Sequence, residues 1–217
     1  MDGCFDLHSH SRCSDGALSP ADLVRHARAC GVDVLALTDH DTTAGVTEAQ
    51  AAAREAGMQL IAGVEVSVSW AQRVIHIVGL DIDPRCAELQ DGLARLRGAR
   101  RERARSIAER LARCGIPGAL EAVETGAGAE AVGRNHFARF LVERGYVKDA
   151  KRAFKRYLGR GASCYVASEW AGLAEAVGWI RAAGGIAVVA HPARYSMSRS
   201  VMRRFLAEFT AAGGGGI

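Results

Sequence analysis

Several features that would place a protein in a membrane or outside the cell are absent from this chain of 217 residues. Its six cysteines are scattered and form no CxxC pair, which argues against a disulfide framework and fits a protein kept reduced. The N-terminus has no basic start followed by an apolar stretch, so it does not resemble a signal peptide. No apolar run has the length needed to span a bilayer. We therefore expect a cytoplasmic protein without a membrane partner, and no feature points to a protein partner.

Internal repeats and low-complexity tracts are also absent, and the length suits one domain or one domain carrying an insertion. Near both ends of the chain, strand-like and helix-like segments alternate, which predicts a mainly parallel α/β architecture of the barrel or open-sheet type. The predicted strands are residues 4–7, 33–38, 59–68, 73–80 and 186–192. One predicted helix begins at Ser19-Pro20. Three others cover residues 44–56, 171–183 and 199–212.

Residues 85–160 lack any strand pattern and are predicted to form several helices. This segment holds 18 Lys and Arg against 9 Asp and Glu, a net charge of +9, whereas the whole chain is +4. The basic character therefore belongs to one segment, and the rest of the chain is acidic. Such asymmetry suggests an anionic partner, although a solvated helical face is the other explanation. We predict a first barrel part at 1–84, a basic helical insertion at 85–161 and a second barrel part at 162–217.

The chain ends in an unusual place for an α/β protein. The last predicted helix runs into four glycines and stops at Ile217, which resembles a helix-to-strand connection with the first residue of a strand. We therefore expect this sequence to be a fragment of a longer protein, with C-terminal strands missing.

Five histidines and two carboxylates lie at or near the ends of predicted strands. In a strand, residues two apart point to the same side, so the HxH of residues 8–10 presents two imidazoles together. A single buried histidine is usually a satisfied core residue, but a whole set at the edge where α/β active sites gather points to bound cations. Burying one such group without a partner would cost roughly several kcal/mol of folding free energy. The set is His8, His10, Asp15, His40, Glu65, His76 and His191.

The ligand types in this set restrict which metal ions are expected. Mixed His, Asp and Glu ligation without cysteine suits manganese, iron or zinc and differs from a structural thiolate site. Seven ligands exceed what one tetrahedral ion needs, so we expect two or three divalent ions, with Glu65, at the end of its predicted strand, bridging two of them. Clusters of this kind activate water and hold the oxygens of a phosphoryl group.

The motifs "HSHSRCSDG", "TDHD", "GVE", "HIVG" and "AHP", in that order, resemble those of the PHP (polymerase and histidinol phosphatase) family, metal-dependent phosphoesterases related to the amidohydrolases. The resemblance covers residues 4–80 and 162–217. It implies a distorted (β/α)7 barrel with up to three ions, usually manganese. It places His8, His10 and Glu65 on one ion; Glu65, His76 and His191 on the second; and Asp15 and His40 on the third. The family's late Asp-x-His, which supplies further ligands, does not occur after His191.

The segments "GRNHFARFLVERG" and "RYLGRGASCYV" resemble the branch of this family that acts on nucleotides. That branch includes phosphatases of nucleoside 3′,5′-bisphosphates and exonucleases that trim RNA from its 5′ end. We therefore predict hydrolysis of the 3′-phosphate of a nucleoside 3′,5′-bisphosphate, with 5′→3′ exoribonuclease activity on short RNA as the alternative. A non-catalytic nucleotide-binding module is the rival of another class. Amidohydrolase chemistry on C–N bonds would leave the basic insertion unexplained.

Several arginines are candidates for binding the substrate's phosphates, because guanidinium groups bind phosphate through two parallel hydrogen bonds. Each of them, taken alone, is equally compatible with a surface or ion-pair role. Arg134, Asn135 and His136 lie at the start of a predicted helix, where free backbone N–H groups favour the binding of a phosphate. Asp39 is expected to orient a metal ligand without binding the ion itself. The substrate-binding candidates are Arg12, Arg134, Asn135, His136, Arg160 and Arg194.

Overall fold

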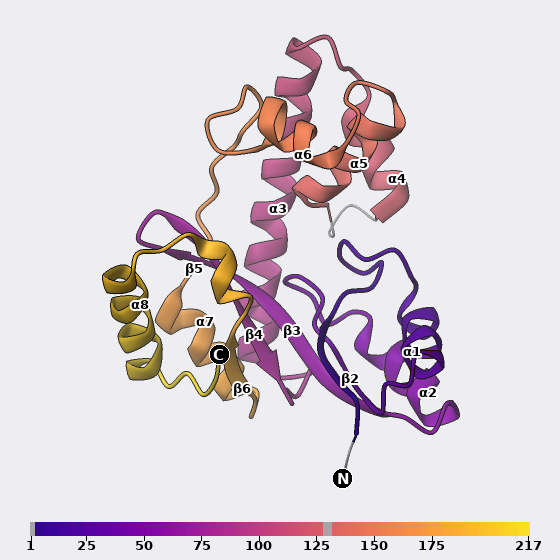
Figure 1. Cartoon of the computed structure of the whole chain (residues 1–217), viewed down its shortest axis with the longest axis vertical. Helices are drawn as coiled ribbons and strands as arrows, with labels where there is room; N and C mark the ends of the chain where they lie inside the picture. Colours follow the sequence, from indigo (N-terminus) through magenta and orange to yellow (C-terminus); the bar gives the residue numbers. More distant parts are fainter. Residues whose placement is uncertain (1–2, 128–131) are drawn as a thin grey trace. The chain divides into compact units, whose positions relative to one another are not determined.

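A curled, half-barrel sheet of mixed strands forms the larger of two compact units in the computed structural model, which describes residues 3–127 and 132–217 (Figure 1). This sheet unit contains Met1–Leu96 and Glu169–Ile217. Within the described residues the sheet has six strands in the order β1-β2-β3-β4-β6, with β5 paired to β3. The strands are β1 Phe5–Ser9, β2 Val34–Leu37, β3 Gln59–Trp70, β4 Arg73–Leu80, β5 Ala171–Gly172 and β6 Ile186–Val189.

Strand β4 runs opposite to its neighbours, which corrects part of the expected parallel arrangement. β1, β2 and β3 pair in parallel, whereas β4 is antiparallel to both β3 and β6. Only Ala71 and Gln72 separate β3 from β4, and both have positive φ, at 44° and 59°. A parallel return needs a crossover of about a dozen residues or more, so this short connection permits only a hairpin.

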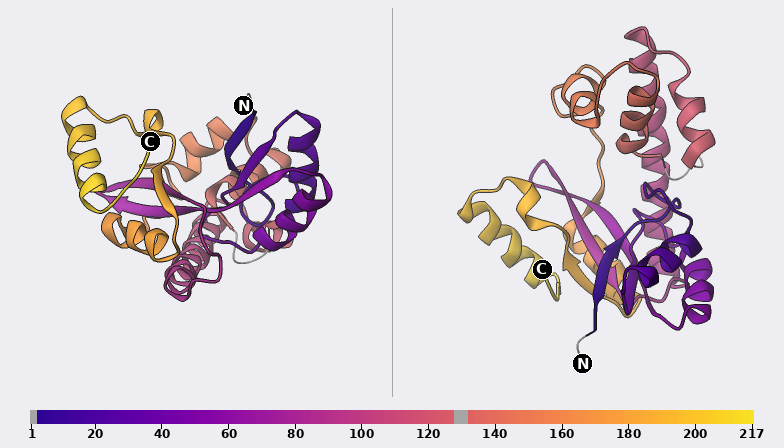
Figure 2. Two further views of the ribbon diagram at one scale, coloured as in Figure 1. Left: turned by 90° about the horizontal axis from the view of Figure 1, so that it is seen from below. Right: turned by 45° about the vertical axis from the view of Figure 1, so that its right-hand side comes forward.

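Helices pack on both sides of the β3–β4 hairpin (Figure 2). On one side lie α1 (Pro20–Ala29) and α2 (Val46–Glu55), whose buried side chains form a core with the fully buried strand β2. On the other side lie α7 (Leu173–Ala182) and α8 (Arg199–Ala211). The predicted start of α1 is confirmed: the Ser19 hydroxyl accepts a hydrogen bond from the Asp22 N–H at 3.0 Å, and Pro20 opens the helix.

The second compact unit, Arg97–Ser168, is called the helical unit below, because its described residues form helical elements. It contains most of α3 (Ala87–Arg113), then α4 (Ala119–Ala127), α5 (Arg134–Glu143), α6 (Ala150–Ala153) and the π-helical turn η1 (Phe154–Leu158). Its core centres on fully buried side chains such as Ile107, Leu111, Phe137 and Leu141. This unit therefore has its own hydrophobic core, as an independently packed unit requires.

The compact units divide at residues 96/97 and 168/169, whereas the predicted boundaries of the insertion are at 84/85 and 161/162. The difference arises because the first turns of α3 pack against α7. A Cβ atom at Gly92 would lie 2.5 Å from the Trp179 ring, and the Arg95 guanidinium stacks 5.1 Å from the centroid of the same ring. Glycine at residue 92 is thus what lets the helix approach the tryptophan.

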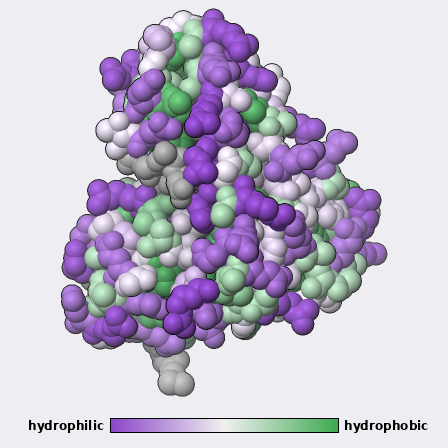
Figure 3. All heavy atoms as spheres, turned by 180° about the vertical axis from the view of Figure 1, so that it is seen from behind, coloured by the Kyte–Doolittle hydropathy of each residue, from purple (hydrophilic) through white to green (hydrophobic). Residues whose placement is uncertain are grey.

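Among the described residues, no helix is both long and apolar enough to cross a membrane. The longest helix, α3, has 27 residues and is rich in arginine. Hydrophilic side chains dominate the face of the molecule drawn in Figure 3, and the hydrophobic ones are scattered among them. Scattered apolar side chains of this kind are normal on a protein surface.

Candidate metal centre

The seven predicted ligands come from strands and loops that the sheet of the first unit brings together. His8 lies in β1 and His10 just beyond it, while His76 lies in β4. His40 follows β2 and forms an isolated parallel bridge with Glu65 of β3. His191 follows β6 and adopts a left-handed backbone conformation with φ 32°. Residues spread over most of the chain therefore meet around one strand.

Glu65 lies inside β3, which ends at Trp70, and not at the strand end predicted for it. The strand continues to Trp70 because β4 extends the pairing, with Glu65 opposite Val78. The parallel pairing with β2, however, stops at Ala62. Glu65 therefore lies just beyond the parallel part of the sheet, at the edge where α/β proteins place their sites.

Five imidazoles surround the carboxylate of Glu65, which is 1% exposed. Their nitrogens lie 3.0–3.2 Å from its oxygens. Oε2 is contacted by His8 Nε2, His10 Nε2 and His40 Nδ1, and Oε1 by His76 Nδ1 and His191 Nε2. These contacts link segments as far apart as Glu65 and His191, so the carboxylate is the centre of the cluster.

Hydrogen bonding alone does not account for this arrangement. Each carboxylate oxygen offers about two lone-pair sites, and three imidazoles converge on Oε2. Burial would raise the pKa of Glu65, but hydrogen bonds from His10, His191, His76 and His8 outweigh it and hold the pKa far below its usual range. The carboxylate is therefore an anion whose neighbours carry more nitrogen atoms than it can bind, as expected of a ligand set for cations.

Asp15 adds a second carboxylate to the cluster. Its oxygens lie 3.9 Å from His10 Nδ1 and from His40 Nε2. The buried Nδ1 atom of His10 has no hydrogen-bond partner among the described residues, and a cation held together with Asp15 would bind this nitrogen. Three groups have ligand atoms within 4.8 Å of one another: His8, His10 and Glu65; His10, Asp15 and His40; and His40, Glu65 and His76. Imidazole with carboxylate suits manganese, iron or zinc.

Asp39 holds the loop that joins two of these ligands. Its buried carboxylate accepts hydrogen bonds from the Ser11 N–H at 2.7 Å, the Ser11 hydroxyl at 2.6 Å and the Ser14 hydroxyl at 2.5 Å. Ser11 and Ser14 lie between His10 and Asp15. The interaction expected of Asp39 with a metal ligand is thus made through the loop that carries His10 and Asp15.

Two contributors were not identified from the sequence. Asp41 accepts hydrogen bonds from the N–H and the hydroxyl of Ser67, at 2.7 and 2.8 Å, and so fixes β3 beside Glu65. The Tyr195 hydroxyl accepts a hydrogen bond from the His76 N–H at 2.9 Å, and burial raises the pKa of Tyr195 to about 12. Tyr195 follows the AHP motif by three residues, which is the one sequence signal that could have found it.

Replacing Tyr195 with phenylalanine is expected to weaken the binding of a divalent ion about tenfold, the low end of the range for partners that support metal ligands. The hydroxyl supports the backbone of His76 while leaving its ring in place, so the effect is smaller than the loss of a ligand. Titration of the chelator-treated protein with manganese, with zinc as a second ion, measures this change. Tyr157→Phe, in the helical unit, is the matched control. Equal affinities in all three proteins would contradict a positioning role for Tyr195.

The substrate-binding candidates fall into two groups. Arg12 and Arg194 are exposed in the sheet unit, next to the loops that carry the metal-ligand candidates. In the helical unit, Arg134 is half-buried, and its guanidinium lies 5.8 Å from the centroid of the Phe154 ring. Burial and the neighbouring Arg100 lower the pKa of Arg134. No carboxylate among the described residues forms an ion pair with it.

The other helical-unit candidates differ in their availability. Asn135 and Arg160 are exposed. His136 is buried, and its Nδ1 accepts a hydrogen bond from the Gly133 N–H at 3.0 Å. His136 therefore caps the start of α5, so one of the N–H groups expected to be free for a phosphate is already bonded.

Three comparisons relate the chain to known proteins. The family model described as "PHP domain" matches residues 6–85. The chain is 49% identical over 214 residues to the 3′,5′-nucleoside bisphosphate phosphatase of Chromobacterium violaceum, covering 98% of this chain and 75% of that protein. It is 48% identical over 213 residues to a 5′-3′ exoribonuclease of Haemophilus influenzae, covering 98% and 77%. The solved structure of an amidohydrolase from Chromobacterium violaceum with bound sulfate superposes with a TM-score of 0.95, at 48% identity over 98% of this chain and 75% of that one.

Proposed function

The chain belongs to the PHP family of metal-dependent phosphoesterases, and we propose that it hydrolyses the 3′-phosphate of nucleoside 3′,5′-bisphosphates. One observation carries this proposal: a buried carboxylate, Glu65, with five imidazoles within 3.2 Å. The substrate is suggested by the Chromobacterium relative, which bears the name of that activity. The basic character of residues 85–160 supports a substrate with more than one phosphate.

We assign two or three divalent ions to this centre, manganese first, with iron or zinc as the alternatives. The imidazoles and Asp15 would hold them, with Glu65 between two of them. When bound, such ions lower the pKa of a water molecule and stabilise the charge on a displaced phosphoryl group. Asp39 keeps the loop between His10 and Asp15 in place through Ser11 and Ser14.

The remaining candidates would bind the phosphates themselves. Arg12 and Arg194 are exposed beside ligand-bearing loops, which suits contacts with the reacting phosphate. Arg134, with Asn135 and Arg160, is assigned to the second phosphate. A guanidinium without a carboxylate partner retains all its donors for a phosphate, and Arg134 is such a group among the described residues.

We also propose that the sheet is part of a distorted (β/α)7 barrel. In support, β1 at one edge of the sheet and the first residue of β6 expose large apolar side chains that a longer sheet would cover. Phe5 and Leu7 of β1 are 62% and 39% exposed, and Ile186 of β6 is 56% exposed. Exposed hydrophobic edges of this kind are normally paired or covered.

The second candidate function is 5′→3′ exoribonuclease activity, which the name of the Haemophilus relative suggests. The two activities use the same chemistry and differ in whether a chain follows the 3′-oxygen. Comparing kcat/KM for adenosine 3′,5′-bisphosphate with that for a short 5′-phosphorylated RNA distinguishes them. A higher value for the mononucleotide supports the first proposal, and a higher value for the RNA supports the second. No turnover of either, by protein loaded with ions, would favour a non-catalytic binding module.

Elemental analysis of protein purified without a chelator is expected to find two or three transition ions per chain. The physical reason is the surplus of ligands around Glu65, which exceeds the needs of one ion. Changing His191 to alanine is expected to lower the count, because this residue is one of two that contact Oε1. One ion or none in a fully active protein would overturn the cluster.

A further inference from the structure

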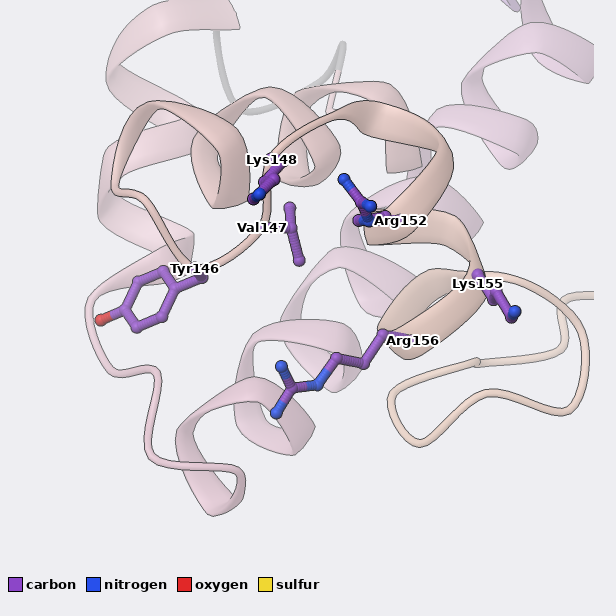
Figure 4. A pocket seen from close by; sticks show the side chains of 6 residues that line it. All are labelled: Tyr146, Val147, Lys148, Arg152, Lys155 and Arg156. Atoms are coloured by element: carbon purple, nitrogen blue, oxygen red, sulfur yellow. The ribbon is translucent and has the colours of Figure 1, made fainter.

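A pocket of about 540 Å³ lies wholly inside the helical unit (Figure 4). This volume is within the range of ligand-binding clefts, about 300–1,000 Å³. Figure 4 shows residues 146–148 on one side and the helical residues 152–156 on the other. Its lining, here called the 146–156 pocket, consists of Tyr146, Val147, Lys148, Arg152, Lys155 and Arg156. None of these residues belongs to the substrate-binding candidates above.

The 146–156 pocket has a large excess of positive charge. Residues 144–160 contain seven Lys and Arg and one acidic residue, Asp149. Asp149 pairs with Arg152 at 3.2 Å. Lys148, Lys155 and Arg156 are exposed and have no acidic partner among the described residues. Like charges gathered without counter-charges repel one another, so the pocket is suited to a ligand with several negative charges.

The walls of the pocket are held in place from both sides. The N–H groups of Tyr146 and Val147 donate to the Leu141 carbonyl oxygen, at 2.9 and 3.3 Å, which fixes that stretch to the end of α5. On the other wall, the Gly159 N–H donates to the Phe154 carbonyl oxygen at 2.7 Å and closes the π-helical turn η1. Single π-helical turns within helices are rare and frequently mark functional sites.

An exposed aromatic ring accompanies the cations. The Tyr146 side chain is 39% exposed, and Figure 4 shows it on the same wall as Val147 and Lys148. Surfaces that bind single-stranded nucleic acid combine basic side chains along the backbone with aromatic rings on which bases stack. Bases in a duplex are stacked already and are not available to such a ring.

We propose that the 146–156 pocket is a binding site for single-stranded RNA. Its cations contact successive phosphates, and Tyr146 stacks on an unpaired base. The inference deepens the proposed function, because it rests on this phosphoesterase acting on nucleotides or RNA. It adds a site for the chain of an RNA substrate that is separate from the groups assigned to the two phosphates of a mononucleotide.

The test measures binding of a fluorescein-labelled oligouridine by anisotropy as the salt concentration is varied. Lys148→Ala/Lys155→Ala is expected to weaken binding about five- to twentyfold at low salt, since each exposed ion pair contributes up to about fivefold. The slope of log K against log salt is expected to become shallower by about 1.4, or roughly 0.7 for each phosphate that a lysine no longer neutralises. Tyr146→Ala is expected to weaken binding without changing that slope, and Tyr146→Phe to restore it.

Arg54→Ala/Arg203→Ala removes the same charge at exposed residues outside the helical unit and is the matched control. Circular dichroism verifies that every variant is folded. Equal losses in both double variants, or equal binding of single-stranded and duplex RNA, would overturn the proposal, as would no loss on changing Lys148 and Lys155. Turnover of adenosine 3′,5′-bisphosphate by the unchanged protein tests the proposed function separately, so either idea can fail without the other.

Discussion

Replacing Glu65 with glutamine is expected to lower kcat/KM for the bisphosphate about 10²- to 10⁴-fold, since bound ions supply several kcal/mol of transition-state stabilisation. Glu65 is the residue that all five imidazoles share, through both of its carboxylate oxygens. An amide keeps the size of the side chain but loses its negative charge and one anionic oxygen. The number of bound ions is expected to fall together with the rate, and elemental analysis measures that fall.

Glu88→Gln, a change at an exposed residue of α3, is the matched control for this experiment. Its rate and metal content are expected to equal those of the unchanged protein. Circular dichroism separates loss of the site from loss of the fold. A folded Glu65→Gln protein with unchanged turnover would mean that the carboxylate only joins strands and histidines.

Changing Arg134 to alanine is expected to lower kcat/KM about ten- to hundredfold on a 3′,5′-bisphosphate, the effect of losing a charge-assisted hydrogen bond of about 1.5–3 kcal/mol. On a small activated monophosphate ester the rate is expected to stay nearly unchanged, because the metal-ligand set is intact. Arg134 opens α5, is half-buried and has no ion-pair partner among the described residues, so its guanidinium is available to a phosphate.

Arg139→Ala lies on the same helix, at an exposed residue, and is the matched control. Arg134→Lys, which keeps the charge without the two-pronged geometry, is expected to give an intermediate rate. Because the Arg134 side chain also packs over Phe154, thermal unfolding must be compared for each variant. An equal loss on both substrates would indicate a role in the fold, and no loss on either would indicate a solvated surface charge.

The identity of the metal-ligand candidates could be predicted from the sequence because each belongs to a short local motif. His8 and His10 share a face because side chains in a strand repeat every two residues. The capping serine, Ser19, predicts the helix that starts at Pro20. The family followed from the order of five short motifs. None of these inferences needed the register of the strands.

The central role of Glu65, in contrast, depends on contacts across the chain. Pairing with β4 carries β3 on to Trp70 and places Glu65 inside the strand, beyond the end of its pairing with β2. The five imidazoles that meet there come from four strands or the residues after them. Strand periodicity says which side a residue faces, but register and curvature decide which residues meet.

The sequence by itself determined the family, the set of metal-ligand candidates and the basic character of residues 85–160. Motif order, residue type and charge depend only on the residues along the chain and not on the fold. Only the tertiary structure decided what supports that set. Asp39 binds the serines of a loop 25–28 residues away, and the Tyr195 hydroxyl reaches the backbone of His76 across 119 residues. The folded conformation of residues 146–156 also forms the pocket around Tyr146, Lys148 and Arg156. Such hydrogen bonds and pockets depend on positions in space, which no local pattern of residues specifies.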